Sequence, residues 1–156
     1  MQVDPYNRFC IDCLHSHSTH VLLALGIFLC ANCAQAHRSP LAGYSYTSLT
    51  VGLPRVKEVL REHWDDYQLL VIAPEVGGNR RFFDFLEEYR LHSIKEAPIE
   101  KRYKSDAVRH YARRLAAIAD SRGFNEKPPA KDWDEKITRA KTVWKDWVTI
   151  SEKKIG

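Results

Sequence analysis

The stretch that decides the fold is residues 10–38, which read CIDCLHSHSTHVLLALGIFLCANCAQAHR. It holds all four cysteines of the chain, Cys10, Cys13, Cys30 and Cys33, in the pattern C-x2-C-x16-C-x2-C. A C-x2-C pair lets two thiolates reach one ion from a tight turn, and two such pairs give the tetrahedral four-sulfur set that zinc prefers. Because every cysteine is then a ligand, the spacing predicts one structural Zn2+ with no open position for a reacting water.

Two disulfides are the competing interpretation of the same four cysteines. Nothing at the N-terminus resembles a secretory signal, and C-x2-C pairs suit a metal in a reducing compartment better than they suit disulfides. We therefore favour the metal site. Because four thiolates already satisfy zinc, we expect His15, His17 and His20, which lie between the two cysteine pairs, to be solvated loop residues.

The composition allows one folded domain with a short appendage. The chain has 156 residues, of which 44% are hydrophobic, and this is enough for a core. Its longest apolar run, residues 21–30, is much shorter than the ~20 residues that cross a bilayer, so we expect it to be buried. The net charge of +4 is mild, whereas dedicated nucleic-acid binders concentrate positive charge. We expect no specific nucleic-acid binding and at most peripheral contact with a membrane.

The region around the cysteines should contain short elements. Residues 21–29 are apolar and partly β-branched, which predicts a helical turn that runs into a buried strand. A short helix after the second cysteine pair should end at Arg38, because Pro40 follows and residues before a proline avoid the helical region. Residues 41–53 are expected to form loop or short strand.

Helical periodicity dominates the rest of the chain. The pattern predicts one helix that begins at Pro54, one that is capped by Asn79, and one that begins at Ser105 and ends near Gly123. Their apolar stripes are, in order, Val56, Val59, Leu60 and Trp64; Phe82, Phe85, Leu86 and Tyr89; and Val108, Tyr111, Leu115 and Ile118. Arg80 and Arg81 follow the second cap. Either a solvated helix end or a contact with a partner or a phosphate would explain them.

The C-terminal residues are expected to form a separate amphipathic helix. Residues 125–131 contain two prolines and are predicted to be a linker, and residues 132–156 carry a stripe with three of the four tryptophans, Trp133, Trp144 and Trp147. This stripe either covers the core of its own domain or docks on a protein partner, and we favour docking because tryptophan is enriched at interface hot spots. The domain boundaries are then 1–124, 125–131 and 132–156.

Residues 7–124 resemble the GTPase-activating domain for Arf-family small GTPases, and the distal part is most similar to the Golgi-type branch. The residues that carry the resemblance are Asn7, the four cysteines with Asp12, Leu25-Gly26-Ile27, His37-Arg38, Ser45, Ser48-Leu49-Thr50, the helix of Trp64, Gly77-Gly78-Asn79 with Phe82 and Phe85-Leu86, and Arg102-Tyr103-Lys104-Ser105. The resemblance implies an α+β fold in which a treble-clef, GATA-like zinc finger with a small sheet is extended by an α-helical array. GATA-type DNA-binding fingers share the cysteine spacing, but they need a strongly basic helix where this chain offers only His37 and Arg38.

The resemblance also implies a function. By resemblance, Arg38 is an arginine finger that an Arf-family GTPase receives in trans, and such fingers raise hydrolysis rates by about 10³–10⁵. The protein would then regulate an enzyme without being one. On a helix, His37 shares the inward face of Cys33, whereas Arg38 lies about 140° round from that cysteine and points away from the metal. Without the resemblance, Arg38 is interpreted as an ordinary surface arginine in a salt bridge.

The sequence departs from the family pattern mainly between Pro40 and Gly52, directly after Arg38. The zinc ligands and core-type positions are kept. This distribution predicts a retained scaffold with relaxed activity, so we expect weak or absent stimulation and favour a non-catalytic structural or protein-interaction subunit of a larger assembly. The resemblance implies a cytoplasmic location at the Golgi or on vesicles, whereas the subunit interpretation fits a mitochondrial, membrane-associated complex.

Overall fold

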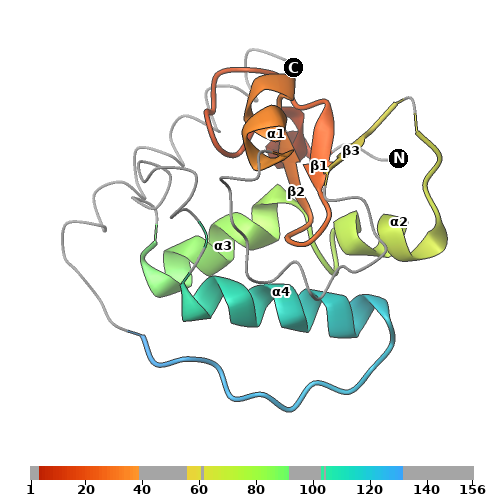
Figure 1. Cartoon of the computed structure of the whole chain (residues 1–156). Helices are drawn as coiled ribbons and strands as arrows, with labels where there is room; N and C mark the ends of the chain where they lie inside the picture. Colours follow the sequence, from red (N-terminus) through yellow and green to blue (C-terminus); the bar gives the residue numbers. More distant parts are fainter. Residues whose placement is uncertain (1–3, 39–55, 61, 92–102, 104, 132–156) are drawn as a thin grey trace.

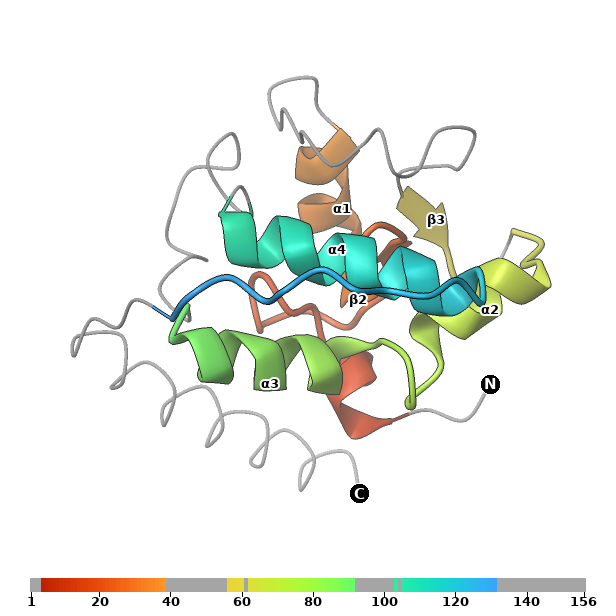
Figure 2. The same cartoon turned by 90° about the horizontal axis from the view of Figure 1, so that it is seen from below.

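The computed structural model describes residues 4–38, 56–60, 62–91, 103 and 105–131. The elements within them are η1 (Pro5–Arg8), β1 (His20–Leu22), β2 (Ile27–Leu29), α1 (Ala31–Arg38), β3 (Val56–Glu58), α2 (Asp66–Ile72), α3 (Asn79–Tyr89) and α4 (Asp106–Ala119). The strands form one antiparallel sheet in the order β2-β1-β3. Helix α1 packs against β1 and β3, while α3 and α4 run side by side below the sheet in the view of Figure 1, and Figure 2 shows them from below. The predicted α+β class is confirmed.

The apolar run between the cysteine pairs is a β-hairpin, which corrects the predicted helical turn leading into one strand. Strand β1 pairs with β2 so that Val21 lies opposite Phe28. The chain reverses at Gly26, whose φ of +61° is a conformation that glycine adopts without steric cost. The run is apolar throughout because neither side of the hairpin faces water, and Val21 and Leu22 belong to two different buried clusters.

Residues 56–58 form a strand, so the helix predicted from Pro54 is wrong. Strand β3 pairs with β1, and Val56 lies opposite Leu22. This pairing decides the conformation of residues 56–58, although the apolar residues Val56, Val59, Leu60 and Trp64 happen to have a helical spacing. Leu60, assigned to the predicted stripe, is 92% exposed. The helix begins later, as α2, where Asp65 and Gln68 form a capping box.

The tip of the hairpin meets the C-terminal end of α2 at one crowded point. A Cβ atom on Gly77 would lie 1.9 Å from the carbonyl oxygen of Val71, and one on Gly26 would lie 2.6 Å from the same oxygen. The backbone nitrogen of Gly78 donates to the carbonyl of Gly26 at 3.0 Å. Glycine is therefore required here for close approach of backbone to backbone, and this contact joins the sheet to the helices.

Asn79 begins α3, but its side chain does not cap that helix as predicted. The N-cap residue is Gly78, which makes no side-chain hydrogen bond. The Asn79 amide instead accepts a hydrogen bond from the backbone nitrogen of Phe28 at 2.7 Å and donates to the carbonyls of Tyr6 and Phe9 at 2.9 and 3.0 Å. It therefore bonds the start of α3 to the edge of the sheet and to η1.

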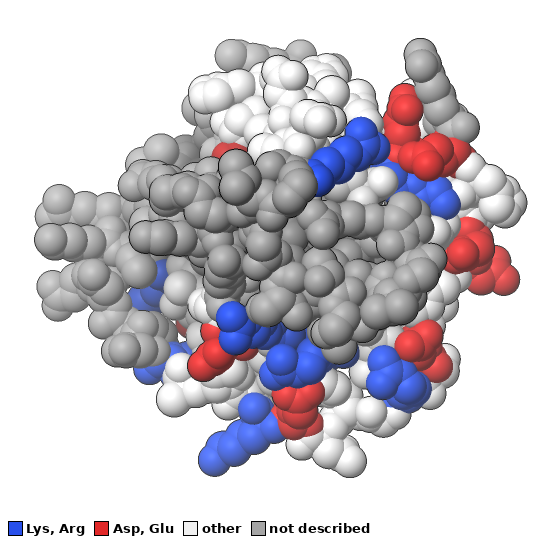
Figure 3. Space-filling model, in the orientation of Figure 1, with Lys and Arg blue, Asp and Glu red and all other residues white. Residues whose placement is uncertain are grey.

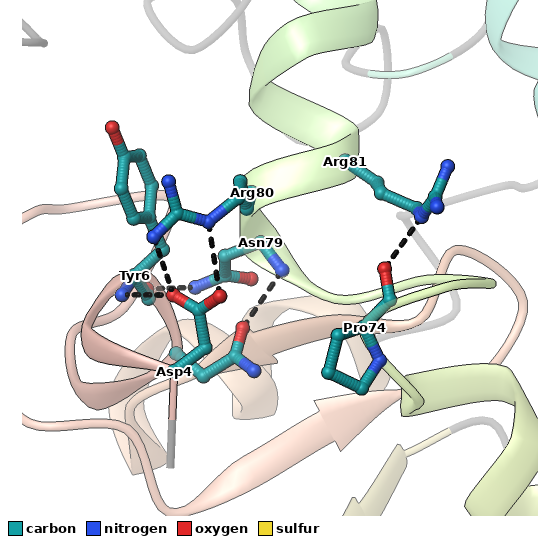
Figure 4. Close-up of polar contacts among 7 residues, drawn as sticks. Asp4, Tyr6, Pro74, Asn79, Arg80 and Arg81 are labelled. Atoms are coloured by element: carbon teal, nitrogen blue, oxygen red, sulfur yellow. Dashed lines mark hydrogen bonds and ion pairs between the residues drawn. The ribbon is translucent and has the colours of Figure 1, made fainter.

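The two arginines after Asn79 have partners within the fold (Figure 4). The Nε of Arg80 donates to Oδ2 of Asp4 at 3.0 Å, and its guanidinium lies 4.1 Å from the centre of the Tyr6 ring. The Nε of Arg81 donates to the carbonyl of Pro74 at 2.6 Å. Both arginines are exposed, which fits the predicted solvated helix end. Arg80 also joins the start of α3 to η1, and Arg81 joins it to the loop after α2. A contact with a partner or a phosphate stays a prediction.

Helix α4 begins as predicted, because the hydroxyl of Ser105 accepts a hydrogen bond from the backbone nitrogen of Val108 at 3.2 Å. It ends at Ala119, before the predicted end near Gly123, and Ile118 at the end of its stripe is 36% exposed. None of the helices in the described residues is both long enough and apolar enough to cross a bilayer.

The predicted linker is extended and lies along α4 towards the end of α3 (Figure 2). Arg113 pairs with the carboxylate of Glu126 at 2.7 Å, and the hydroxyl of Tyr89 donates to the carbonyl of Pro129 at 3.0 Å. The Nζ of Lys131 lies 2.9 Å from the carboxylate of Glu88. The linker is thus attached to the helices as far as Lys131; the predicted helix within 132–156 lies outside the described residues.

Candidate metal centre and Arg38

The fold brings the four cysteines to one point. Their sulfur atoms all lie within 4.8 Å of one another, and those of Cys13 and Cys30 are 3.9 Å apart. A tetrahedron with metal–sulfur lengths of about 2.3 Å has edges of about 3.8 Å. The cluster therefore fits one zinc ion, and the disulfide alternative fails because all four cysteines are free.

Each cysteine pair lies on a tight backbone turn. In the first, the backbone nitrogen of Leu14 donates to the carbonyl of Cys10 at 2.9 Å, and Leu14 has a φ of +63°. In the second, the backbone nitrogen of Cys33 donates to the sulfur of Cys30 at 3.4 Å. The second pair leads directly into α1, with Cys33 in the first turn of that helix. The N-terminal end of α1 is therefore fixed to the cysteine cluster.

The thiols interact strongly with one another. A hydrogen bond from Cys33 lowers the pKa of Cys10 to about 5. The same hydrogen bond, followed by burial, raises the pKa of Cys33. In this pair, one thiolate and one thiol share a proton. A metal ion that binds the cluster takes the place of this proton, which is released to water.

The histidines between the cysteine pairs are not part of the cluster. His15 and His17 are exposed, as predicted, whereas His20 is half-buried in β1 and its Nδ1 lies 2.7 Å from the hydroxyl of Thr19. Within the part of the chain that the structure describes, the candidate metal group consists of the four cysteines.

The orientation predicted for the end of α1 is confirmed. His37 is fully buried, whereas its neighbour Arg38, the last residue of the helix, is exposed. Whether Arg38 acts as a finger stays a prediction, and the divergent segment after it lies outside the described residues. Trp133, Trp144 and Trp147 also lie outside the described residues, so their role in partner binding stays a prediction.

Two residues that match the family pattern, Asp12 and Tyr103, contact the end of α1, and sequence reasoning assigned neither of them a role there. Asp12 lies between the first two cysteines, and its Oδ2 is 2.6 Å from Nε2 of His37. The hydroxyl of Tyr103 donates to the other carboxylate oxygen of Asp12. An acidic residue inside a cysteine pair was a signal for the first contact, whereas nothing in the local sequence indicates that Tyr103 returns to it from 91 residues away.

Among the residues that the structure describes, the face in Figure 3 shows no concentrated basic patch. Described lysine and arginine side chains are interspersed there with aspartate and glutamate. Phosphate backbones are bound by clustered positive charge.

Comparison with known proteins relates this arrangement to one family. The ArfGap family model, described as "Putative GTPase activating protein for Arf", matches residues 1–120. ADP-ribosylation factor GTPase-activating protein 3 of Bos taurus is 28% identical over 115 residues, which are 74% of this chain and 20% of that protein. An uncharacterized protein of Caenorhabditis elegans, F07F6.4, is 29% identical over 119 residues, covering 76% of this chain and 20% of the relative. The chain thus spans about a fifth of the length of these relatives.

A solved structure is also similar. It is a crystal structure described as "putative GTPase activating protein for ADP ribosylation factor" from Cryptosporidium parvum, with a TM-score of 0.50 and 25% identity. The match covers 76% of this chain and 81% of the other. Because the family model spans residues 1–120, including the four-cysteine cluster and α1, the chain belongs to the ArfGap family.

Proposed function

We propose that this chain is a GTPase activator for an Arf-family small GTPase, that Arg38 is its arginine finger, and that a structural Zn2+ on the four cysteines holds the helix that carries the finger. The observation that carries the proposal is the position of Arg38. It is the exposed last residue of a helix whose first turn contains Cys33 of the four-sulfur cluster.

The chemistry follows from what a small GTPase lacks. Hydrolysis of GTP builds negative charge on the oxygens around the γ-phosphorus, and an arginine supplied in trans neutralises that charge. A guanidinium suits this role because it is always protonated and presents a planar fork of donors. Zinc with four thiolates has no open coordination position, so its contribution is to hold the two cysteine pairs together.

The test is single-turnover hydrolysis by an Arf-type GTPase loaded with GTP, measured with and without this protein. The family match supports an activator, so here we expect a saturable increase in rate with protein concentration, in place of the weak or absent stimulation expected from the sequence alone. A GTPase from another small-GTPase branch is the matched control and should hydrolyse at its intrinsic rate. No stimulation of any Arf-type GTPase at saturating protein would contradict the proposal.

A second candidate function is that of a non-catalytic subunit of a larger assembly. The observation that favours it is the attached linker, which ends with Lys131 beside Glu88 and leads into the tryptophan-bearing sequence 132–156. Under this candidate, Trp144→Ala or Trp147→Ala releases the protein from stoichiometric partners that co-purify with it. Partner binding that survives deletion of 132–156 would exclude this role for the tryptophans.

A further inference from the structure

Both ends of α1 are attached to the same short segment of chain. The N-terminal end carries Cys33, whose sulfur lies in one cluster with those of Cys10 and Cys13. The C-terminal end carries His37, which contacts Asp12, a residue between those two cysteines. A helix of 8 residues is about 12 Å long, so the cluster alone would leave its last turn free to fray.

The attachment at the C-terminal end is a buried set of three side chains. His37 and Asp12 lie 2.6 Å apart, and their side chains are 0% and 1% exposed. Tyr103 donates from its hydroxyl to the second oxygen of the Asp12 carboxylate. The Tyr103 ring also stacks on the His37 imidazole, with ring centres 5.9 Å apart and planes 10° from parallel. Each carboxylate oxygen of Asp12 therefore has a hydrogen-bond partner in the stacked pair: Oδ2 contacts Nε2 of His37, and Oδ1 accepts from the hydroxyl of Tyr103.

Tyr103 is held in an unfavourable backbone conformation to make these contacts. Its φ is +64°, in the left-handed region that bulky residues rarely adopt, and the residue is fully buried. Such a conformation persists only where the surrounding structure determines it, and it is commoner at functional sites than elsewhere.

We infer that Asp12 and Tyr103 are positioning residues for Arg38. They clamp His37 against the first cysteine pair and thereby fix the rotation of the last turn of α1, on which Arg38 is the exposed neighbour of His37. This inference rests on the proposed role of Arg38. A misplacement of about 1 Å at a reacting centre can lower a rate about 100-fold, so a clamp on the adjacent residue has a large effect on an arginine finger.

The test compares Tyr103→Phe, which removes only the hydroxyl, and Asp12→Asn with the unmodified protein. In single-turnover hydrolysis we expect the maximal stimulated rate to fall about 10- to 100-fold. The half-saturating concentration and the zinc content should stay unchanged. Tyr111→Phe is the matched control, because the Tyr111 hydroxyl oxygen is buried without a hydrogen bond in the described part of the chain, and it should leave the rate intact.

A double mutant separates positioning from general destabilisation. If Tyr103 acts through Arg38, then Tyr103→Phe has no further effect on the rate in an Arg38→Ala background. A further loss of similar size in that background would overturn the inference, as would an unchanged maximal rate in both single variants.

A second measurement tests the clamp even if the protein stimulates no GTPase. Tyr103→Phe should increase amide hydrogen exchange in the last turn of α1, at residues 34–38, at least tenfold, while exchange in β1 and β2 stays unchanged. Absence of stimulation by the unmodified protein would then count against the proposed function alone. Unchanged exchange at residues 34–38 would count against the clamp.

Discussion

The side-chain oxygen of Asn79, at the start of α3, accepts a hydrogen bond from the backbone nitrogen of Phe28 in β2 at 2.7 Å. The same side chain donates to two carbonyls in the N-terminal segment, so one amide joins three parts of the fold. Asn79 is 1% exposed and Phe28 is buried, so at least the Phe28 amide has little access to water when the Asn79 side chain is removed.

Asn79→Ala should therefore lower the free energy of unfolding by about 2–4 kcal/mol, since it leaves one buried and two partly buried backbone groups without this partner. Arg80→Ala is the matched control at the next position. Its side chain is half exposed in its pair with Asp4, so its loss should cost less than about 1 kcal/mol. Urea unfolding of both variants checks this, and equal costs would contradict the assigned role of Asn79.

Gly77 and Gly123 make a second matched pair. Gly77→Ala places a Cβ 1.9 Å from the carbonyl oxygen of Val71, so the backbone must shift, and we expect a loss of more than about 2 kcal/mol. A Cβ on Gly123 meets nothing within 4 Å. Gly123→Ala should then be neutral or stabilise by up to about 1 kcal/mol, because it restricts the unfolded chain. Thermal unfolding distinguishes the two, and a harmless Gly77→Ala would disprove the close approach.

Two tyrosines with buried hydroxyls should respond differently to removal of the hydroxyl. Burial raises the pKa of Tyr111, so its stabilising contribution is complete below the ordinary tyrosine pKa of about 10 and is lost as the pH rises above it. Tyr111→Phe cannot ionise and should move alkaline unfolding to higher pH at no cost at pH 7. Tyr103→Phe should cost about 1–3 kcal/mol at pH 7, because it leaves Asp12 with one hydrogen bond fewer. Unfolding curves at pH 7 and pH 11 test the pair; an unmoved alkaline transition in Tyr111→Phe would refute the assignment.

Removal of one ligand should remove the metal and the N-terminal fold together. Cys30→Ser should reduce the zinc content from one ion per chain to none and unfold the region of β1, β2 and α1, since structural zinc contributes directly to folding. His15→Ala, at an exposed position between the cysteine pairs, should keep one zinc ion. Elemental analysis with circular dichroism measures both effects, and a folded Cys30→Ser protein without zinc would show that the metal is dispensable.

The sequence predicted best where chemistry is local. The cysteine spacing predicted the cluster, and Pro40 predicted the end of α1. The helical period predicted most of α3 and, with the Ser105 cap, the start of α4. It predicted worst where a distant partner decides the outcome. Val56 and Leu60 have a helical spacing, yet residues 56–58 form a strand because β1 lies beside them. The start of α3 was found, but the bonds of Asn79 run to residues about 50 and 70 positions earlier in the chain.

The candidate site shows the same division. The four cysteines and the outward direction of Arg38 follow from spacing along the chain. The contact of Tyr103 with Asp12 joins residues 91 positions apart, so it required the fold to be known. Sequence reasoning therefore predicted what holds the first turn of α1 and missed what holds the last.

The most direct test of the account is the stimulated rate of single-turnover GTP hydrolysis by an Arf-type GTPase with the unmodified protein, Arg38→Ala and Arg38→Lys. We expect stimulation by the unmodified protein, and a loss of about 10³-fold or more for Arg38→Ala with zinc content unchanged. Arg38→Lys should fail too, because an ammonium does not reproduce the planar fork of donors. Stimulation by Arg38→Ala equal to that of the unmodified protein would contradict the central claim.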